Sequence, residues 1–153
     1  MKPQHIRPLA LCIFSCGGRI LVNEGRDPVK CQNYCRPLGG GIDFGEPSGL
    51  ALAREIREEL GAEVTNLRIL GMLENIFTYL GNSGHEIIQV YDGEFVDRTL
   101  YQRPFLPGAE SDGTPFRAFW RARSHFSATL PLFPDGLTEL LEAKSVFKTA
   151  AGP

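Results

Sequence analysis

The chain has 153 residues, of which 42% are hydrophobic and 22% are charged, and its formal net charge is −2. This is the composition of an ordinary globular protein, and the length predicts a single domain over residues 1–153 that buries about two thirds of the surface exposed in the unfolded chain. The slight negative charge gives no basic field that would attract a phosphate backbone. We therefore do not expect polymeric DNA or RNA as the primary ligand.

The first apolar segments predict a β-hairpin. Leu9–Cys16 and Arg19–Glu24 are rich in apolar and branched residues, and the glycine pair at 17–18 favours a tight turn between antiparallel strands. The apolar run Leu9–Phe14 is too short for a transmembrane helix or a signal-peptide core, so we expect a cytoplasmic protein without a membrane partner. A third short strand, Tyr34–Leu38, is predicted to lead into the glycines at 39–41.

The four cysteines occur as two C-x3-C pairs, which would be compatible with a zinc site or with two disulfides. Small zinc sites usually use two-residue spacing, and cytosolic thiols stay reduced. Free thiols that are buried or half-buried are therefore the default expectation. The residues concerned are Cys12, Cys16, Cys31 and Cys35.

A second hairpin is predicted in the middle of the chain. Leu67–Tyr79 and Glu86–Phe95 are strand-like and are joined by a turn that contains glycine. Polar residues interrupt these strands at Glu74, Asn75 and Gln89. These interruptions indicate that one face of the hairpin lines a site.

The C-terminal third predicts a loop, a strand and a helix. Arg98–Pro115 contains several prolines and glycines without a clear period, which predicts a long loop. Phe116–Arg121 predicts a short strand. Asp135 is predicted to cap a final helix, whose apolar residues share one face: Leu137, Leu140, Leu141 and Phe147. Helices that alternate with hairpins favour an α+β fold, in which a mixed sheet is covered on both faces.

The strongest functional signal lies in Gly40–Ala62. The helix predicted over Ser48–Leu60 carries three glutamates, which are Glu55, Glu58 and Glu59. They share an arc of about 100°, where like charges repel by about 0.2–0.5 kcal/mol per pair. Two of them also lie in the last turn, where the helix dipole disfavours anions. The pattern is compatible with a solvated charged face. A bound cation, however, would offset both the repulsion between the glutamates and their unfavourable interaction with the helix dipole.

The residues around these acids resemble the signature of the Nudix hydrolases. That signature runs glycine, five residues, glutamate, seven residues, then arginine, glutamate, an aliphatic, any residue, two glutamates, any residue, glycine and an aliphatic. The chain matches it with Gly40, Glu46 and the run Arg54-Glu55-Ile56-Arg57-Glu58-Glu59-Leu60-Gly61-Ala62. Ala62 is the one departure, and we expect it to affect packing rather than chemistry. The resemblance implies an α/β/α sandwich with a mixed, mainly antiparallel sheet between helices.

Clustered carboxylates without a nearby histidine or cysteine suit Mg²⁺, with Mn²⁺ as a substitute. By resemblance, the family's metal ligands fall on the carbonyl of Gly40 and on the side chains of Glu55, Glu58 and Glu59. Also by resemblance, Arg54 and Glu46 match residues that orient these acids. The alternative for Arg54 is an ordinary surface ion pair.

The general base is left open by the sequence. In some members of the family a helix glutamate serves, here Glu58 or Glu59, and in others a glutamate from a distant loop. Glu110, in the stretch AESDG, and Glu86, at a strand start, are the distant candidates, and either is also compatible with plain solvated surface.

Substrate contacts are predicted outside the signature. Aromatic residues that could stack a base include Phe77, Tyr79 and Trp120, although at least half of the chain's candidate aromatics are expected in the core. Tyr79 lies 17 residues after Ala62, about where dinucleoside polyphosphate hydrolases of the family carry a tyrosine. Arg36 is a further substrate-binding candidate.

These features predict a Mg²⁺-dependent pyrophosphohydrolase that cleaves the phosphoanhydride of a nucleoside diphosphate linked to a moiety X, as in a dinucleoside polyphosphate, a nucleotide sugar or ADP-ribose. Two alternatives stay open: a nucleotide-binding sensor or regulatory module with the same fold, and a pyrophosphatase that sanitises nucleoside triphosphates. The expected partner is a small-molecule nucleotide derivative. Because hairpin-rich sheets have exposed edges that can pair with another chain, we also expect a homodimer.

Overall fold

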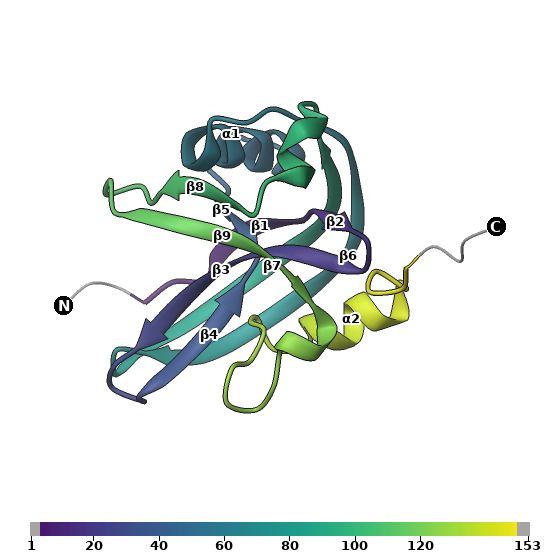
Figure 1. Cartoon of the computed structure of the whole chain (residues 1–153). Helices are drawn as coiled ribbons and strands as arrows, with labels where there is room; N and C mark the ends of the chain where they lie inside the picture. Colours follow the sequence, from purple (N-terminus) through teal and green to yellow (C-terminus); the bar gives the residue numbers. More distant parts are fainter. Residues whose placement is uncertain (1–3, 150–153) are drawn as a thin grey trace.

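The computed structural model describes residues 4–149. The strands in chain order are β1 (Arg7–Ile13), β2 (Ser15–Cys16), β3 (Arg19–Asp27), β4 (Gln32–Arg36), β5 (Leu38–Gly41), β6 (Val64–Tyr79), β7 (Asn82–Phe95), β8 (Phe105–Ala109) and β9 (Pro115–Ala122). The α-helices are α1 (Ser48–Leu60) and α2 (Leu137–Ala143), and the short 3₁₀-helices are η1 (Arg98–Gln102) and η2 (Arg123–His125). Figure 1 shows α1 and α2 on opposite sides of the strands.

The strands form two sheets rather than one. The first has the order β5-β1-β7-β6, in which β1 and β7 are parallel and the other pairs are antiparallel. The second has the order β2-β3-β9-β8, with β4 also paired to β3, and is antiparallel throughout. The predicted α+β class and α/β/α arrangement are confirmed.

Strand β1 lies between the two halves of the core. Successive side chains of a strand point to opposite faces, and in β1 they enter different apolar clusters. Ala10 and Cys12 belong to the cluster that contains Leu52 and Ile56 of α1. Leu9, Leu11 and Ile13 belong to the cluster that contains Leu137 and Leu141 of α2. The continuous apolar run of β1 therefore reflects burial on both faces.

Helix α1 has the predicted bounds, Ser48–Leu60. Its last turn ends at Gly61, which adopts the left-handed conformation with φ 67° and donates its N–H to the carbonyl of Arg57. The apolar face buries Ala51, Leu52 and Ile56. Burying this stripe turns the glutamates of the other face towards the rim of the first sheet.

The predicted N-terminal hairpin was wrong in extent. Strand β1 ends at Ile13, and Ser15 and Cys16 of β2 pair with Ile20 and Arg19 in the other sheet. The reason is that β1 pairs with β5 and β7 instead. Similarly, the predicted strand Tyr34–Leu38 is divided between β4 and β5, which belong to different sheets.

Two C-terminal predictions also need correction. The predicted loop Arg98–Pro115 contains η1 and the strand β8, because β8 finds a partner in β9. Asp135 does not cap α2: the N-cap is Gly136, with φ 88° and no side-chain cap hydrogen bond. Phe147 lies beyond the end of α2, although it still packs against the same apolar cluster.

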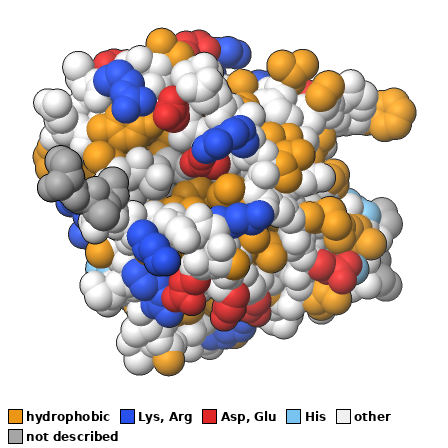
Figure 2. Space-filling model, turned by 90° about the vertical axis from the view of Figure 1, so that its right-hand side faces the viewer, with side chains coloured by type: hydrophobic (Ala, Val, Ile, Leu, Met, Phe, Trp, Pro, Cys, Tyr) orange, Lys and Arg blue, Asp and Glu red, His pale blue; other side chains and the backbone are white. Residues whose placement is uncertain are grey.

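The second hairpin is confirmed and forms the other edge of the first sheet. Strand β6 exposes Ile69, Met72 and Ile76. It lies towards the right of Figure 1, and Figure 2 shows that side of the molecule, where hydrophobic side chains lie among charged ones. An apolar edge strand favours self-association, which supports the expected homodimer. The homodimer stays a prediction.

All four cysteines are free thiols, as expected. The expected burial holds for Cys12 and Cys35, which are buried, and for Cys16, which is half-buried, but it is wrong for Cys31, which is exposed. Within residues 4–149, no helix is long and apolar enough to cross a membrane.

Candidate active site

The glutamates of α1 lie at different depths on one face of the helix. The side chain of Glu55 is 19% exposed and that of Glu58 is 57% exposed, while Glu59 is half-buried. We refer to Glu55, Glu58 and Glu59, together with the neighbouring Glu110, as the acid cluster. Without a cation these carboxylates repel one another, so the cluster is unfavourable for the fold by itself.

The glycine segment of β5 packs against the carboxylate of Glu55. A Cβ atom at Gly40 would lie 2.4 Å from the carboxyl carbon of Glu55, so the backbone and the carboxylate can approach only because residue 40 is glycine. Gly40 is paired with Ala10 in the β1–β5 ladder, which fixes the loop against the core. The backbone of β5 and the carboxylate of α1 therefore meet at one point.

Arg54 ties the loop to the helix. Its guanidinium donates from Nε and Nη2 to both oxygens of Glu46, each at 2.9 Å, and from Nη2 to the carbonyl of Gly41 at 3.0 Å. Nη1 contacts Glu55 at 3.1 Å and Glu58 at 3.3 Å. The hydrogen bond from Arg54 holds the pKa of Glu46 below its ordinary value. Such a bidentate arrangement fixes both partners, which an ordinary surface pair does not.

Glu59 has the most perturbed environment in the cluster. Burial, together with the charges of Glu110 and Glu55, raises its pKa from 4.5 to about 8, and the charge of Arg36 acts in the opposite direction. Glu110 comes close because β8 passes directly against the end of α1: a Cβ atom at Gly108 would lie 2.8 Å from the carbonyl oxygen of Glu59. Asn23 of β3 donates from Nδ2 to Glu110 at 3.2 Å.

A cavity of about 620 Å³ is connected to the acid cluster through Arg36, although no residue of the cluster lines it. Arg36 lies in its wall and also acts electrostatically on Glu59, and Arg7 lies in its wall with a nitrogen near the backbone of Gly41. Besides these two cations and Lys30, the wall includes the aromatic residues Tyr34, Phe77, Tyr79 and Phe133 and the acids Asp27, Glu86 and Asp135. The cavity therefore combines three cations, three acids and aromatic surface, so it offers groups that could contact the phosphates, the hydroxyl groups and the base of a nucleotide.

The structure separates the two distant candidates for a general base. Glu110 belongs to the acid cluster, whereas Glu86 lies in the cavity wall. Glu86 is 7% exposed, and its one ion pair in the described part of the chain is with Arg7, at 3.7 Å. Neighbouring His85 is paired with Glu74 instead, at 3.1 Å.

The aromatic candidates divide between cavity and core. Phe77 and Tyr79 of β6 line the cavity, as does the polar residue Asn75 of the same strand. Trp120 is 7% exposed and packs in the core on α1's side of the sheets, where it stacks on Tyr101 at 5.3 Å. The structure therefore places Trp120 among the packing residues and not in the cavity wall.

Several residues near the site escaped sequence reasoning. Asn23, Arg7, Lys30 and Tyr34 lie outside the signature, on strands or turns whose local sequence indicates only β-structure. The sequence carries a signal for the cavity only on β6, where Asn75, Phe77 and Tyr79 are spaced two apart and so share one face of the strand.

Comparisons with known proteins identify the fold and the family of the chain. A curated RNA pyrophosphohydrolase from Caulobacter vibrioides is 34% identical over 77 residues, which are 50% of this chain and 43% of that protein, so the chain spans less than half the length of this relative. A NUDIX hydrolase from Nitrosomonas europaea has the same fold, with a TM-score of 0.64 at 16% identity over 95% of this chain and 92% of that one. A MutT NUDIX hydrolase from Burkholderia pseudomallei has a TM-score of 0.59 at 20% identity, over 97% and 100% of the two chains. The NUDIX domain model matches residues 3–127, and the chain therefore belongs to the NUDIX domain family.

Proposed function

We propose that this chain is a Mg²⁺-dependent pyrophosphohydrolase that cleaves the phosphoanhydride of a nucleoside diphosphate linked to a moiety X. The observation that carries the proposal is the acid cluster itself, together with a cavity of about 620 Å³ whose wall residue Arg36 acts electrostatically on Glu59 of that cluster. Carboxylates suit a divalent cation, and the cavity suits a nucleotide.

The acid cluster fits a hard metal ion. Its donors are all oxygens, which favours Mg²⁺ or Mn²⁺ over softer metals, and the missing side chain at Gly40 brings loop backbone against Glu55. We assign the metal to Glu55, Glu58, Glu59 and the carbonyl of Gly40. When bound, Mg²⁺ would neutralise charge on the anhydride oxygens and lower the pKa of the attacking water.

The protein's own groups would orient and complete this site. Arg54 fixes the directions of Glu55 and Glu58 through its contacts with both, while Glu46 holds Arg54 in place. We assign the general base to Glu110, because its Oε1 accepts from Asn23 and Oε2 is left to take a proton from water. Glu86 is assigned to substrate recognition, since it lies in the cavity wall.

The cavity would hold the nucleotide. Arg36 and Arg7, which both line the cavity, would neutralise the phosphates, and Lys30 adds a third positive charge. The faces of Phe77 and Tyr79 would pack on a base.

A second candidate substrate is the 5′-triphosphate end of RNA. It is favoured by the similarity to the Caulobacter vibrioides RNA pyrophosphohydrolase over 77 residues and by the cations of the cavity. The net charge of −2 opposes contacts with a long RNA backbone. Recognition would therefore be confined to the terminal nucleotide.

The test is a substrate panel with Mg²⁺, with and without chelator. It includes a dinucleoside polyphosphate, a nucleotide sugar, ADP-ribose, nucleoside triphosphates and a 5′-triphosphorylated RNA oligonucleotide, and it measures phosphate release after coupling to a phosphatase or pyrophosphatase. We expect chelator-sensitive cleavage of one class well above the others, lost in Glu58→Gln. Tight binding of one compound without cleavage would replace this proposal with the sensor alternative.

The same panel tests the assignment of the base. Glu110→Gln is expected to lower kcat for the preferred substrate, whereas Glu86→Gln is expected to change KM. If Glu110→Gln retains full kcat, the base is one of the helix glutamates.

A further inference from the structure

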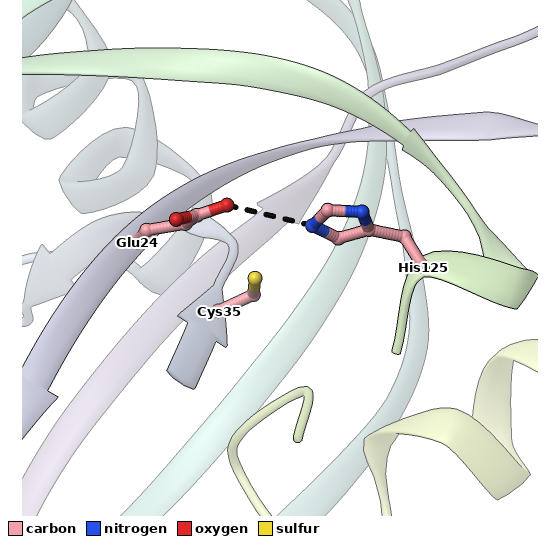
Figure 3. A group of neighbouring side chains, drawn as sticks. All are labelled: Glu24, Cys35 and His125. Atoms are coloured by element: carbon pink, nitrogen blue, oxygen red, sulfur yellow. Dashed lines mark hydrogen bonds and ion pairs between the residues drawn. The ribbon is translucent and has the colours of Figure 1, made fainter. Parts of the chain in front are cut away.

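A second group of side chains with metal-binding chemistry lies apart from the acid cluster. Glu24, Cys35 and His125 each offer one ligand atom, and these atoms all lie within 4.8 Å of one another. Figure 3 shows the three side chains converging from different segments: Glu24 from β3, Cys35 from β4 and His125 from η2. A carboxylate, a thiol and an imidazole differ from the all-oxygen acid cluster in the metals that they favour.

The sheet places this group and the acid cluster on opposite faces. Glu24 and Cys35 are direct partners in the antiparallel β3–β4 ladder, so their side chains share one face. The adjacent pair in the ladder is Asn23 and Arg36, whose side chains point to the other face because successive residues alternate. There Asn23 bonds Glu110 and Arg36 acts on Glu59.

The arrangement is that of convergent ligands and not of a nucleophile relay. Nε2 of His125 lies 3.4 Å from Oε1 of Glu24, and in Figure 3 the same side of the ring is nearer to Cys35 while the other ring nitrogen points away. A cysteine–histidine–acid relay needs the acid and the thiol on different ring nitrogens. Here both face one nitrogen, as the ligands around a single ion would.

We propose that Glu24, Cys35 and His125 bind a divalent metal ion of the zinc class, with water in a fourth position. Zinc is bound by cysteine sulfur, histidine nitrogen and carboxylate oxygen, and three protein ligands with one open position are a common arrangement. The side chains of Glu24 and His125 are 42% and 30% exposed, which gives an ion and a water access from solvent. Cys35 is fully buried and closes the inner side.

Two neighbouring features disfavour metal binding: the guanidinium of Arg121 and the proton on the Cys35 thiol. Arg121 approaches Oε1 of Glu24 at 3.8 Å and so competes for that carboxylate. Within residues 4–149, the ion pairs of Glu24 both use Oε1, so Oε2 is available to an ion. Burial and the charge of Glu24 raise the pKa of the Cys35 thiol to about 12, so binding must release the thiol proton to solvent. A thiolate and a carboxylate together then balance the two charges of the ion.

The bound ion would cross-link segments that form one wall of the cavity. Cys35 donates its N–H to the carbonyl of Pro131 at 2.8 Å and accepts from the N–H of Phe133 at 2.8 Å. Phe133 and Asp135 in turn line the cavity. A metal at Cys35 and His125 therefore links β4, η2 and the segment at 131–135, and we expect it to stabilise the fold rather than to take part in hydrolysis.

The test uses Co²⁺ as a probe on the full chain after removal of metals with chelator. We expect about one equivalent to give near-ultraviolet thiolate-to-metal absorption, displaced by Zn²⁺ but not by excess Mg²⁺. The band should be lost in Cys35→Ser and retained in Cys31→Ser, the matched change at an exposed cysteine. It should also be retained in Glu58→Gln, which separates this site from the proposed Mg²⁺ site.

Because Cys35 is buried, Cys35→Ser could lose the band through a folding defect. His125→Gln and Glu24→Gln test the same site at partly exposed side chains, where a change disturbs folding less. Each should weaken Co²⁺ binding by about tenfold or more, and Zn²⁺ should raise the urea midpoint of the unmodified chain but not that of His125→Gln. Absence of the thiolate band in the unmodified chain would overturn the proposal. So would unchanged Co²⁺ affinity in His125→Gln, or a band that disappears in Cys31→Ser.

Discussion

The acid cluster and the cavity are built in opposite ways. Most of the acid cluster, and the groups that orient it, come from the continuous segment Gly40–Ala62, with Glu110 added by the loop after β8. The cavity is assembled from β1, β3, β4, β6, β7 and the residues before α2. The proposed chemistry is thus local in sequence, whereas the proposed substrate recognition depends on how distant strands pair.

This difference has a consequence for how each region responds to mutation. A change in the acid cluster acts on charges held by one helix and should alter kcat. A change in the cavity acts on a surface shared by several strands and should alter KM or the choice of substrate.

The largest effect is expected from Glu58→Gln. Removing one of the proposed metal ligands should lower kcat by about 100-fold or more. The unfolding midpoint should change little, because Glu58 is exposed and the relief of repulsion with neighbouring acids offsets the loss of its ion pair with Arg54. Steady-state kinetics and urea unfolding measure the two effects. The control is Glu63→Gln, an exposed glutamate just beyond α1; equal losses in both variants would contradict the assignment.

A smaller loss is expected from Arg54→Lys. Lysine keeps the charge but cannot reproduce the bidentate bond to Glu46 together with the contacts to Gly41 and Glu55. Losing a group that orients metal ligands typically costs about 10- to 100-fold in activity or metal affinity. Arg57→Lys is the matched control, because Arg57 makes a bidentate bond to Glu63 away from the cluster. Similar kinetics for both variants would show that Arg54 is an ordinary surface residue.

In the cavity, Glu86→Gln should raise KM about tenfold and leave kcat nearly unchanged. The carboxylate is 7% exposed and pairs with Arg7 at 3.7 Å, so a neutral glutamine would no longer hold the Arg7 guanidinium in position for the phosphates, while the acid cluster stays undisturbed. Glu74→Gln, in the pair with His85, is the control on the neighbouring strand. A fall in kcat with constant KM would place Glu86 in the chemical step and break the division between the two regions.

The smallest effect is a pH dependence of stability in chelator. The folded chain holds the Glu59 proton up to about pH 8, whereas the unfolded chain loses it near 4.5. The folded state then binds more protons between these values, so Glu59 makes stability fall as the pH rises from about 4.5 to about 8. Urea midpoints across this range should fall more steeply for the unmodified chain than for Glu59→Gln. Parallel slopes would mean that Glu59 is not protonated in the folded chain.

Sequence reasoning succeeded where the determining interactions are short in range. The bounds of α1 follow from its apolar period and from Gly61. The signature singled out Arg54 and Glu46 as residues that orient the acids, and the structure adds that they bond each other. It failed where long-range pairing decides. The loop predicted over Arg98–Pro115 contains β8 because β9 is available as a partner, and this also brings Glu110 to α1.

The same limit applies to single residues. Arg7 meets Glu86 because β1 and β7 are parallel neighbours, although the two residues are far apart in the chain. Trp120 resembles other exposed aromatic candidates in sequence, but its strand lies between β3 and β8 and turns the ring into the core. Neither outcome has a local signal, since both depend on strand order.

The double burial of β1 has a further consequence, for folding. Its alternate side chains belong to the two apolar clusters beneath α1 and α2, so neither cluster is complete without this one strand. The halves of the molecule therefore cannot unfold independently, and loss of order near either helix should spread through β1 to the other. We expect one cooperative transition, with hydrogen exchange in the centre of β1 governed by global unfolding and the edges of the sheets opening first.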